Sequence, residues 1–263
     1  MKITSRAWKA VAIVATAGLA LTACSSGQSD EPAAEGQEGL QFVEEGKLTV
    51  CSDIPYEPFE FTDENGEIVG LDIDLANEIA KDLELETKIV DSSFDAIESG
   101  LFSTQCDLAM SSISITEERK GNMDFSDPYL DDDLMLIARK GSGVTDFESA
   151  KGKKVAVQQA TTGENYGQEN GLETVGYEDA GLQLQALESG QVDAALGNQS
   201  VMGHAIKDKD EFEVVDKIAT GEQLGIAAAK GNTELIEKVN GTLTRLSESG
   251  ELDAITEKWL DTK

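Results

Sequence analysis

The chain has 263 residues, of which 40% are hydrophobic and only four are proline, so it can bury one large core or two medium cores. Its 51 acidic residues against 21 Lys and Arg give a formal net charge of -30, which argues against a nucleic-acid partner, because such a protein must set cations along the phosphates. Three cysteines and one histidine leave little material for a metal cluster, and we expect no metal and no cofactor.

The first 24 residues have the pattern of an export signal. Lys2, Arg6 and Lys9 precede or flank the start of an apolar run over 10–23, which is short for a membrane span and has the length of a signal-peptide core. The run ends in Leu-Thr-Ala-Cys at Cys24, which resembles a bacterial lipoprotein cleavage box. That resemblance implies removal of the preceding residues and attachment of a diacylglyceryl group to Cys24. The alternative is an ordinary secretory signal with a chance cysteine.

The next segment, 24–43, is rich in Ser, Gly, Glu and Gln and is typical of a flexible tether. Removing 1–23 deletes three cations and no acids, which leaves 18 Lys and Arg against 51 acids and a net charge of -33. Such a surface repels anionic lipid headgroups. No later segment is apolar enough to span a bilayer. We therefore expect the protein to be held at the extracytoplasmic face of the cell membrane by its lipid anchor alone.

After the tether, strand-like and helix-like segments alternate. The apolar spacing predicts amphipathic helices over 72–84, 232–247 and 251–260. Strands are predicted at 48–52, 87–90, 107–110, 134–138, 154–157, 193–196, 212–215 and 224–228. Alternation of this kind predicts an α/β fold with mainly parallel sheets.

Three hydroxyl groups, those of Ser111, Ser112 and Ser114, follow the predicted strand 107–110. In open α/β sheets, ligands bind beyond the carboxyl ends of the strands. Arg119 lies in the first turn of a helix capped by Thr116 and can fold back toward these hydroxyls. A guanidinium is the preferred planar partner of a carboxylate. Arg119 therefore predicts a carboxylate site, and a surface salt bridge is the alternative.

Two other loops follow predicted strands. Asp53 follows strand 48–52 and can accept hydrogen bonds from an ammonium group, while Tyr56 offers a ring to a ligand. The alternative is an aspartate that caps the turn, with core aromatics behind it. Gln158, Thr161 and Thr162 follow strand 154–157 at a helix N-terminus, which suits an anionic group, although many α/β proteins have such a turn without a ligand.

In this order and spacing, the three loops resemble the amino-acid-binding branch of the bacterial extracellular solute-binding proteins, family 3. The resemblance covers 46–260 and includes the segments 70–76, 111–119, 124–129, 152–157, 190–194 and 258–259. It implies a periplasmic-binding-protein type II fold, with two α/β lobes joined by a two-strand hinge. The implied boundaries are 44–132 with 222–263 for lobe 1, and 133–221 for lobe 2.

The same resemblance implies a function. The protein would be the extracytoplasmic substrate-binding component of an ABC importer, a monomer that closes about its hinge on a polar amino acid or a close derivative. Its partners would be the ligand, the ABC permease and the permease's ATPase. It would not be an enzyme. The alternatives are an exported arogenate or prephenate dehydratase-like enzyme, with Asp53 or Glu60 as the acid, and a sensory protein that presents ligand to a receptor.

The family pattern assigns roles to particular residues. Arg119, Ser112, Ser114 and Thr162 would hold the ligand's α-carboxylate, while the Ser111 carbonyl would accept from its amino group. Tyr56 and Phe94 would sandwich the ligand's side chain. Asp53 would be the first-lobe acid that meets a cationic part of the ligand, and Gln158 falls where the family varies the residue that selects the side chain.

Two positions depart from the family pattern. Asn198 stands where the family usually has an aspartate for the α-ammonium, so either Asp53 takes over that role or the ligand is not a plain α-amino acid. Ala160 stands where glycine is common, and its methyl group could narrow the site or shift the turn. The sequence does not rank glutamine, cystine, a basic amino acid or an opine-like compound as the ligand.

Two cysteines remain besides Cys24. Cys51 and Cys106 lie on strands that are neighbours in the implied fold and in an oxidising compartment, so we predict a disulfide between them. Two buried free thiols are the alternative. Asp131, Asp132 and Asp133 are expected to form a solvated run near the hinge, and a calcium site is the alternative.

Overall fold

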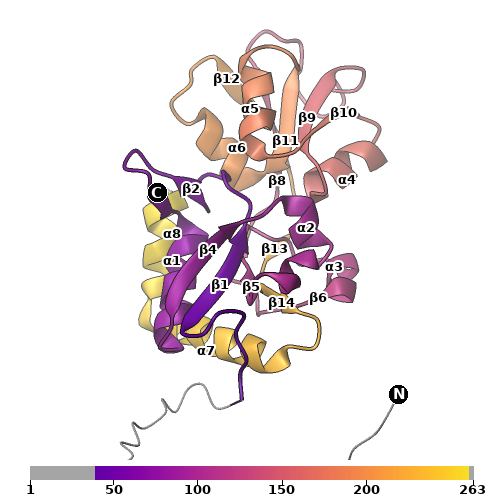
Figure 1. Cartoon of the computed structure of the whole chain (residues 1–263). Helices are drawn as coiled ribbons and strands as arrows, with labels where there is room; N and C mark the ends of the chain where they lie inside the picture. Colours follow the sequence, from indigo (N-terminus) through magenta and orange to yellow (C-terminus); the bar gives the residue numbers. More distant parts are fainter. Residues whose placement is uncertain (1–38, 261–263) are drawn as a thin grey trace, which may run out of the picture. The chain divides into compact units, whose positions relative to one another are not determined.

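The computed structural model describes residues 39–260, in which two five-stranded sheets are the centres of two α/β lobes (Figure 1). The first sheet has the order β4-β1-β5-β14-β6 and the second β10-β9-β11-β8-β12. The strands of the first sheet are β1 (Lys47–Ser52), β4 (Glu86–Asp91), β5 (Leu108–Ala109), β6 (Met123–Phe125) and β14 (Ala227–Ala229). Those of the second are β8 (Leu134–Arg139), β9 (Lys154–Gln158), β10 (Glu173–Tyr177), β11 (Ala194–Asn198) and β12 (Phe212–Ile218).

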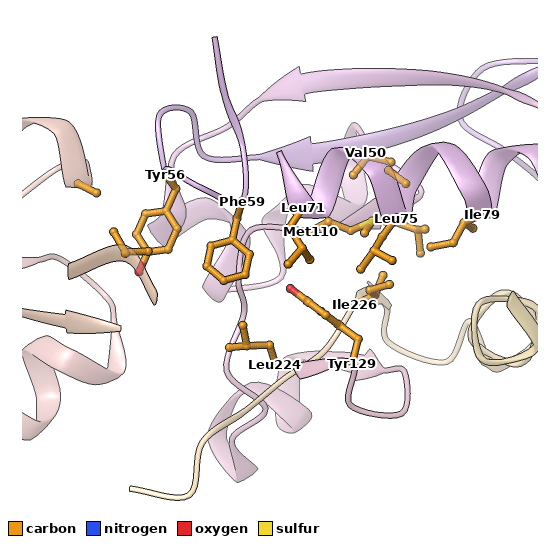
Figure 2. Close-up of a cluster of buried hydrophobic side chains, with 14 of the residues drawn as sticks. Val50, Tyr56, Phe59, Leu71, Leu75, Ile79, Met110, Tyr129, Leu224 and Ile226 are labelled. Carbon is orange, nitrogen blue, oxygen red and sulfur yellow. The ribbon is translucent and has the colours of Figure 1, made fainter. Parts of the chain in front are cut away.

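The two long helices of lobe 1, α1 and α7, bury apolar residues in its core. In α1, Leu71, Leu75 and Ile79 are fully buried at helical spacing, as the predicted helix over 72–84 requires. Figure 2 shows the centre of this cluster, where Phe59 and Tyr129 lie beside the start of α1. The helical elements of this lobe are α1 (Leu71–Asp82), α2 (Phe94–Glu98), η1 (Leu101–Thr104), α3 (Glu117–Asn122), α7 (Thr233–Ser249) and α8 (Glu251–Leu260).

Lobe 2 is built around β8 and β9, each buried at all but one residue, which supply apolar side chains to its core. Its helices are α4 (Thr162–Glu169), α5 (Ala180–Glu188) and α6 (Gln199–Ile206). The chain passes between the lobes beside a short antiparallel pair, β7 (Leu130–Asp131) with β13 (Gln223–Leu224). A further hairpin pairs β2 (Phe61–Thr62) with β3 (Ile68–Val69).

The predicted fold class is confirmed, and the sheets are mainly parallel as predicted, with one reversed strand in each. In the first sheet, β1 is parallel to β4 and β5, whereas β14 is antiparallel to β5 and β6. In the second, β9 is parallel to its neighbours and β8 antiparallel to its own. The reversed strands β8 and β14 are the first strands reached after the chain has passed the hinge pair, so they enter their sheets from the hinge end. The predicted strand 224–228 is split in the structure. Its first residue belongs to the hinge strand β13, and its last two belong to β14.

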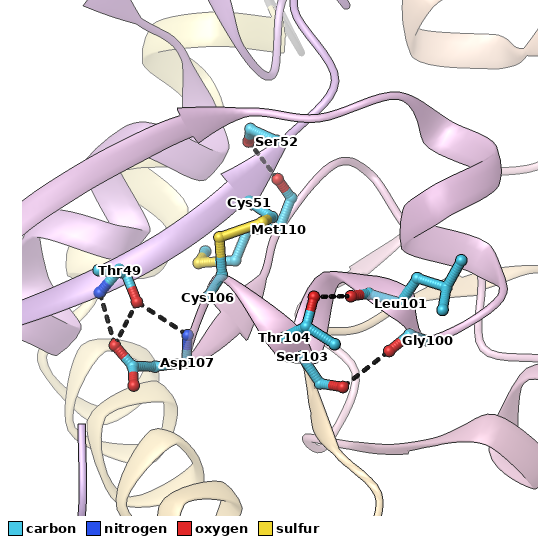
Figure 3. Close-up of a disulfide and its surroundings, with 10 residues drawn as sticks. All are labelled: Thr49, Cys51, Ser52, Gly100, Leu101, Ser103, Thr104, Cys106, Asp107 and Met110. Carbon is cyan, nitrogen blue, oxygen red and sulfur yellow. Dashed lines mark hydrogen bonds between the residues drawn. A yellow bond between two sulfur atoms is a disulfide. The ribbon is translucent and has the colours of Figure 1, made fainter. Parts of the chain in front are cut away.

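The predicted disulfide between Cys51 and Cys106 is present (Figure 3). Both residues are buried, Cys51 on β1 and Cys106 just before β5. The same two segments are also joined by the Asp107 carboxylate, which accepts hydrogen bonds from the backbone N–H of Thr49 at 2.8 Å and from its hydroxyl at 2.5 Å. The covalent link therefore reinforces an existing strand pair rather than creating it.

Among the described glycines, Gly70, immediately before α1, has the least room for a side chain. Its φ is +141°, and a Cβ added there would lie 2.0 Å from the Phe59 carbonyl oxygen. We expect Gly70→Ala to lower the free energy of unfolding by about 3 kcal/mol or more, because backbone must move. Gly241→Ala, in the middle of α7 with open space around it, should instead be neutral or stabilising by up to about 1 kcal/mol.

Urea unfolding of the two variants checks this expectation. Equal stability of the Gly70→Ala and Gly241→Ala proteins would contradict it.

Candidate functional site

Loops from both sheets meet between the lobes. Asp53 follows β1 and the serine stretch follows β5, while Gln158 ends β9 and Asn198 ends β11. All four lie at the carboxyl ends of strands, where parallel neighbours present their loops on the same edge of a sheet. Hydrogen bonds across the interface show that these loops face one another. The interface therefore brings together residues that the sequence analysis had singled out separately.

Arg119 is a buried cation, with 3% of its surface exposed. Thr116 caps α3 through the Arg119 backbone N–H, as predicted. The guanidinium donates to the Ser114 carbonyl at 2.9 Å and, across the interface, to the Ala160 carbonyl at 3.0 Å, and it stacks on the Phe94 ring at 5.1 Å. Burial lowers the pKa of Arg119. The alternative of a surface salt bridge is wrong, because the side chain is enclosed by both lobes.

A carboxylate already lies among the hydroxyl groups expected to bind one. Glu222, on the segment entering β13, accepts hydrogen bonds from Ser114 and from Thr162, both at 2.7 Å. Ser114 belongs to lobe 1 and Thr162 to lobe 2, so a single carboxylate oxygen joins the two lobes. Hydroxyl groups from both lobes thus hold one carboxylate, and the Arg119 guanidinium bonds to the backbone of the same serine.

Asp53 faces the other lobe directly. Its carboxylate accepts a 2.5 Å hydrogen bond from the Gln158 amide, and its backbone N–H donates to the Ser111 hydroxyl at 3.1 Å. Burial is the main cause that raises the pKa of Asp53 to about 7, and the bond from Gln158 opposes it. A cation placed against this carboxylate would restore its ionised form.

Tyr56 and Asn198 form a third contact between the lobes. The Tyr56 hydroxyl donates to the Asn198 side-chain oxygen at 2.9 Å, and the Asn198 amide donates to the Asp132 carbonyl at 3.3 Å. Burial and the charges of four acids raise the pKa of Tyr56. The four acids are Asp132, Glu60, Asp53 and Glu222. Four acids therefore act on the place where Tyr56 and Asn198 join the two lobes.

Two buried carboxyl groups, those of Glu60 and Asp72, bind the serine stretch. Glu60 accepts a hydrogen bond from the Ser111 hydroxyl, while Asp72 accepts from the Ser112 backbone N–H at 2.8 Å and from the Tyr129 hydroxyl at 2.7 Å. Burial raises the pKa of Glu60 well above its usual range and that of Asp72 to about 6. The backbone at Ser112 has a positive φ of 47°, which these bonds hold in place.

The remaining predicted residues are placed as follows. The Thr161 hydroxyl caps α4 by accepting from the Glu164 backbone N–H at 3.2 Å, so this side chain fixes the turn. Ala160 has a φ of +63°, a conformation that favours the glycine common in the family. The Ser112 hydroxyl is buried and has no hydrogen-bond partner within residues 39–260.

Two acids near the site were not recognised from the sequence. Asp132 was expected in a solvated run, but its exposed fraction is 3%, because it lies under the start of α6. Glu222 was not singled out at all, and the only signal was its place beside the predicted hinge. Within the described part of the chain, no three His, Cys, Asp or Glu side chains are grouped to hold a metal ion. No helix there has the length and apolar character needed to cross a membrane.

The pKa of Asp53 gives a testable pH dependence. Because the pKa is higher in the folded protein than the ordinary value of 3.8, ionising Asp53 costs stability as the pH rises from about 4 to about 7. Asp53→Asn removes this cost and keeps an oxygen for Gln158. One unit of pKa corresponds to about 1.4 kcal/mol, so we expect the ligand-free variant to match the wild type near pH 4 and exceed it by about 1 kcal/mol or more at pH 8.

Urea unfolding at both pH values measures this difference. Asp208→Asn, a change at an exposed residue after α6, is the control and should follow the wild type at each pH. If the Asp53→Asn and wild-type stabilities change in parallel, the carboxyl group is not strained by burial.

Comparison with known proteins identifies the family. The model of the bacterial extracellular solute-binding proteins, family 3, matches residues 48–262. Among curated proteins, the chain is 32% identical to the arginine-binding extracellular protein ArtP of Bacillus subtilis, covering 96% of this chain and 97% of ArtP. It is 30% identical to the L-cystine-binding protein TcyJ of Escherichia coli, covering 84% of this chain and 86% of TcyJ.

Among solved structures, a mutant of ArgBP from T. maritima is similar, with a TM-score of 0.78 and 37% identity over 82% of this chain and 96% of that one. The two lobes thus have the type II arrangement of periplasmic amino-acid-binding proteins. Since the family match spans nearly all of the described residues, the chain belongs to the bacterial extracellular solute-binding proteins, family 3.

Proposed function

We propose that this protein binds a cationic α-amino acid, with L-arginine as the first candidate, between its two lobes. The observation that carries the proposal is the Glu222 carboxylate between the hydroxyls of Ser114 and Thr162, beside buried Arg119. Groups from two lobes that hold an internal carboxylate are suited to hold a ligand's α-carboxylate in its place. A ligand that contacts both lobes stabilises the closed form by its extra contacts there.

The charge of the site favours a cationic side chain. Asp53 is buried opposite Gln158, and Glu60 lies next to it behind Ser111. A guanidinium or ammonium group reaching Asp53 would pair with its carboxylate and replace the Gln158 contact. Tyr56 and Phe94, both buried at the interface, would pack on the two sides of the ligand's side chain. Arginine-binding relatives support this assignment, and the cystine-binding relative is the reason to test other amino acids.

We further propose that the protein delivers this ligand to an ABC permease and its ATPase. The lobe boundaries at 132/133 and 221/222 and the lipid anchor at Cys24 are part of this proposal; Cys24, the signal peptide and most of the 24–43 tether lie outside the described residues. Adjacent permease and ATPase genes would support transport. An adjacent receptor gene without a permease would favour a sensory role.

A ligand screen tests the proposal. Purified protein without its signal peptide is mixed with each of the 20 L-amino acids, L-ornithine and L-cystine, and the unfolding temperature is recorded, because bound ligand stabilises by mass action. We expect the largest shift with L-arginine, followed by L-ornithine and L-lysine, with calorimetry giving the affinities. A largest shift with L-glutamate would contradict the charge argument.

The enzyme alternative is tested with the same preparation. Family relatives are named as binding proteins, which favours binding without turnover. When the protein is incubated with arogenate or prephenate, each compound should break down no faster than it does without protein. Formation of phenylalanine or phenylpyruvate would instead make Glu60 or Asp53 the candidate acid.

A further inference from the structure

The α-ammonium of a bound amino acid needs an acid that Asn198 does not provide. Both ends of the Asn198 side chain are engaged, its oxygen by the Tyr56 hydroxyl at 2.9 Å and its amide by the Asp132 carbonyl at 3.3 Å. The amide oxygen can accept from an ammonium but carries no full charge. We propose that Asp132, which lies behind Asn198, supplies the negative charge that stabilises the ligand's α-ammonium. This proposal rests on the proposed function.

The carboxyl group of Asp132 is buried and only half satisfied. One oxygen accepts from the Ser200 backbone N–H at 3.0 Å and from its hydroxyl at 2.9 Å, so it fixes the start of α6 directly after Asn198. The other oxygen is buried and has no hydrogen-bond partner among residues 39–260. A buried acceptor without a partner is costly, and the cost is recovered when a cation arrives.

The electrostatic surroundings point the same way. Burial raises the pKa of Asp132 to about 7, and the hydrogen bonds from Ser200 oppose this rise only in part. Among the four acids whose charges raise the pKa of Tyr56, Asp132 has the largest effect. Because the Tyr56 hydroxyl is bonded to Asn198, the charge of Asp132 acts on the place where an ammonium would meet the Asn198 oxygen.

Asp132 could instead have a purely structural role. Asp132 also lines a cavity of about 410 Å³ with Ser200, His204 and Lys217, where its second oxygen would bind water and serve only the fold. The two roles differ in what they do to ligands. A charge that serves the ammonium discriminates between an amino acid and the same acid without its amino group, whereas a structural role affects both equally.

The experiment measures binding of two probes by calorimetry. They are the L-amino acid that binds most tightly in the screen, expected to be L-arginine, and the matching acid without the α-amino group, here 5-guanidinopentanoate. Asp132→Asn keeps an oxygen for Ser200 and removes the charge. We expect affinity for the amino acid to fall about ten-fold or more, as for loss of a charge-assisted contact, and affinity for the deamino acid to change less than about two-fold.

Two further variants complete the test. Asp131→Asn makes the same change at an exposed neighbour on β7 and should bind both probes like the wild type. Asn198→Asp should restore most of the amino-acid affinity in the Asp132→Asn background, because it returns the charge to the same place, and add less than about three-fold to the wild type.

The outcomes separate the two proposals. Wild-type affinity in Asp132→Asn, equal loss of both probes, or a ten-fold gain from Asn198→Asp alone would each overturn the role of Asp132 while leaving amino-acid binding intact. The Asn198→Asp single variant decides the matter even if Asp132→Asn fails to fold. Wild-type protein that binds no amino acid would overturn the proposed function, and this inference with it.

Discussion

Arg119→Ala should lower affinity for L-arginine by at least about thirty-fold. Loss of one partner from a buried, hydrogen-bonded charge pair costs about 2–5 kcal/mol, and 2 kcal/mol is about thirty-fold. The variant also loses the bond from Arg119 to the Ala160 carbonyl, which joins the lobes, so the closed form is weakened as well. The affinity of Arg119→Lys for L-arginine should lie between those of the wild type and Arg119→Ala, because an ammonium keeps the charge but not the planar guanidinium geometry.

A second arginine supplies the matched control. Arg139 on β8 stacks on Phe212 at 4.8 Å and donates to the Glu188 carbonyl, which repeats the contacts of Arg119 within lobe 2 alone. Arg139→Ala should bind L-arginine like the wild type. Calorimetry gives the affinities and circular dichroism confirms the fold. An Arg119→Ala affinity within about three-fold of the wild type would mean that the guanidinium does not hold the ligand's carboxylate.

Removing the disulfide should destabilise the protein by about 2–4 kcal/mol. Cys51 and Cys106 close a loop with a sequence separation of 55, for which the chain-entropy estimate is about 4 kcal/mol. The Thr49–Asp107 contacts hold the same strands without a covalent bond, so the Cys51→Ala/Cys106→Ala variant should still fold and bind. Urea unfolding of the variant and the wild type measures the difference.

Reduction provides the control for this expectation. Dithiothreitol should lower the urea midpoint of the wild type toward that of the double variant and leave the double variant unchanged. A wild-type midpoint that does not respond to dithiothreitol, or two free thiols in the unreduced protein by mass spectrometry, would contradict the stabilising role.

Because of the acids around Tyr56, we expect stability and ligand binding to oppose each other at this site. Asp53 and Asp132 are both buried, and burial raises the pKa of each to about 7. Ionising either acid costs the ligand-free fold stability at neutral pH, and under the proposed function a cationic ligand would relieve that cost. A variant that gains stability by losing either charge should therefore lose affinity for L-arginine.

Local sequence patterns determined most elements and the loops that carry the site. Helix α1 follows from apolar residues at helical spacing, and the strands β1, β8 and β9 from short apolar runs, because periodicity depends only on neighbours in the chain. The position of Arg119 beside Ser114 could be predicted because its cap and its serines lie within nine residues, whereas its role in binding stays a prediction. The pairing of Cys51 with Cys106 needed the family resemblance as well, because spacing alone does not specify partners.

Only the tertiary structure decided which distant groups meet and which charges are buried. Asp53 and Gln158 are separated by 105 positions, and Tyr56 and Asn198 by 142, so their contacts depend on how the chain passes the hinge twice. Asp132 belongs to a run of three acids that looks solvated, and it is buried because α6 begins on top of it. Burial and charge balance are sums over all packed elements, and no local pattern contains them.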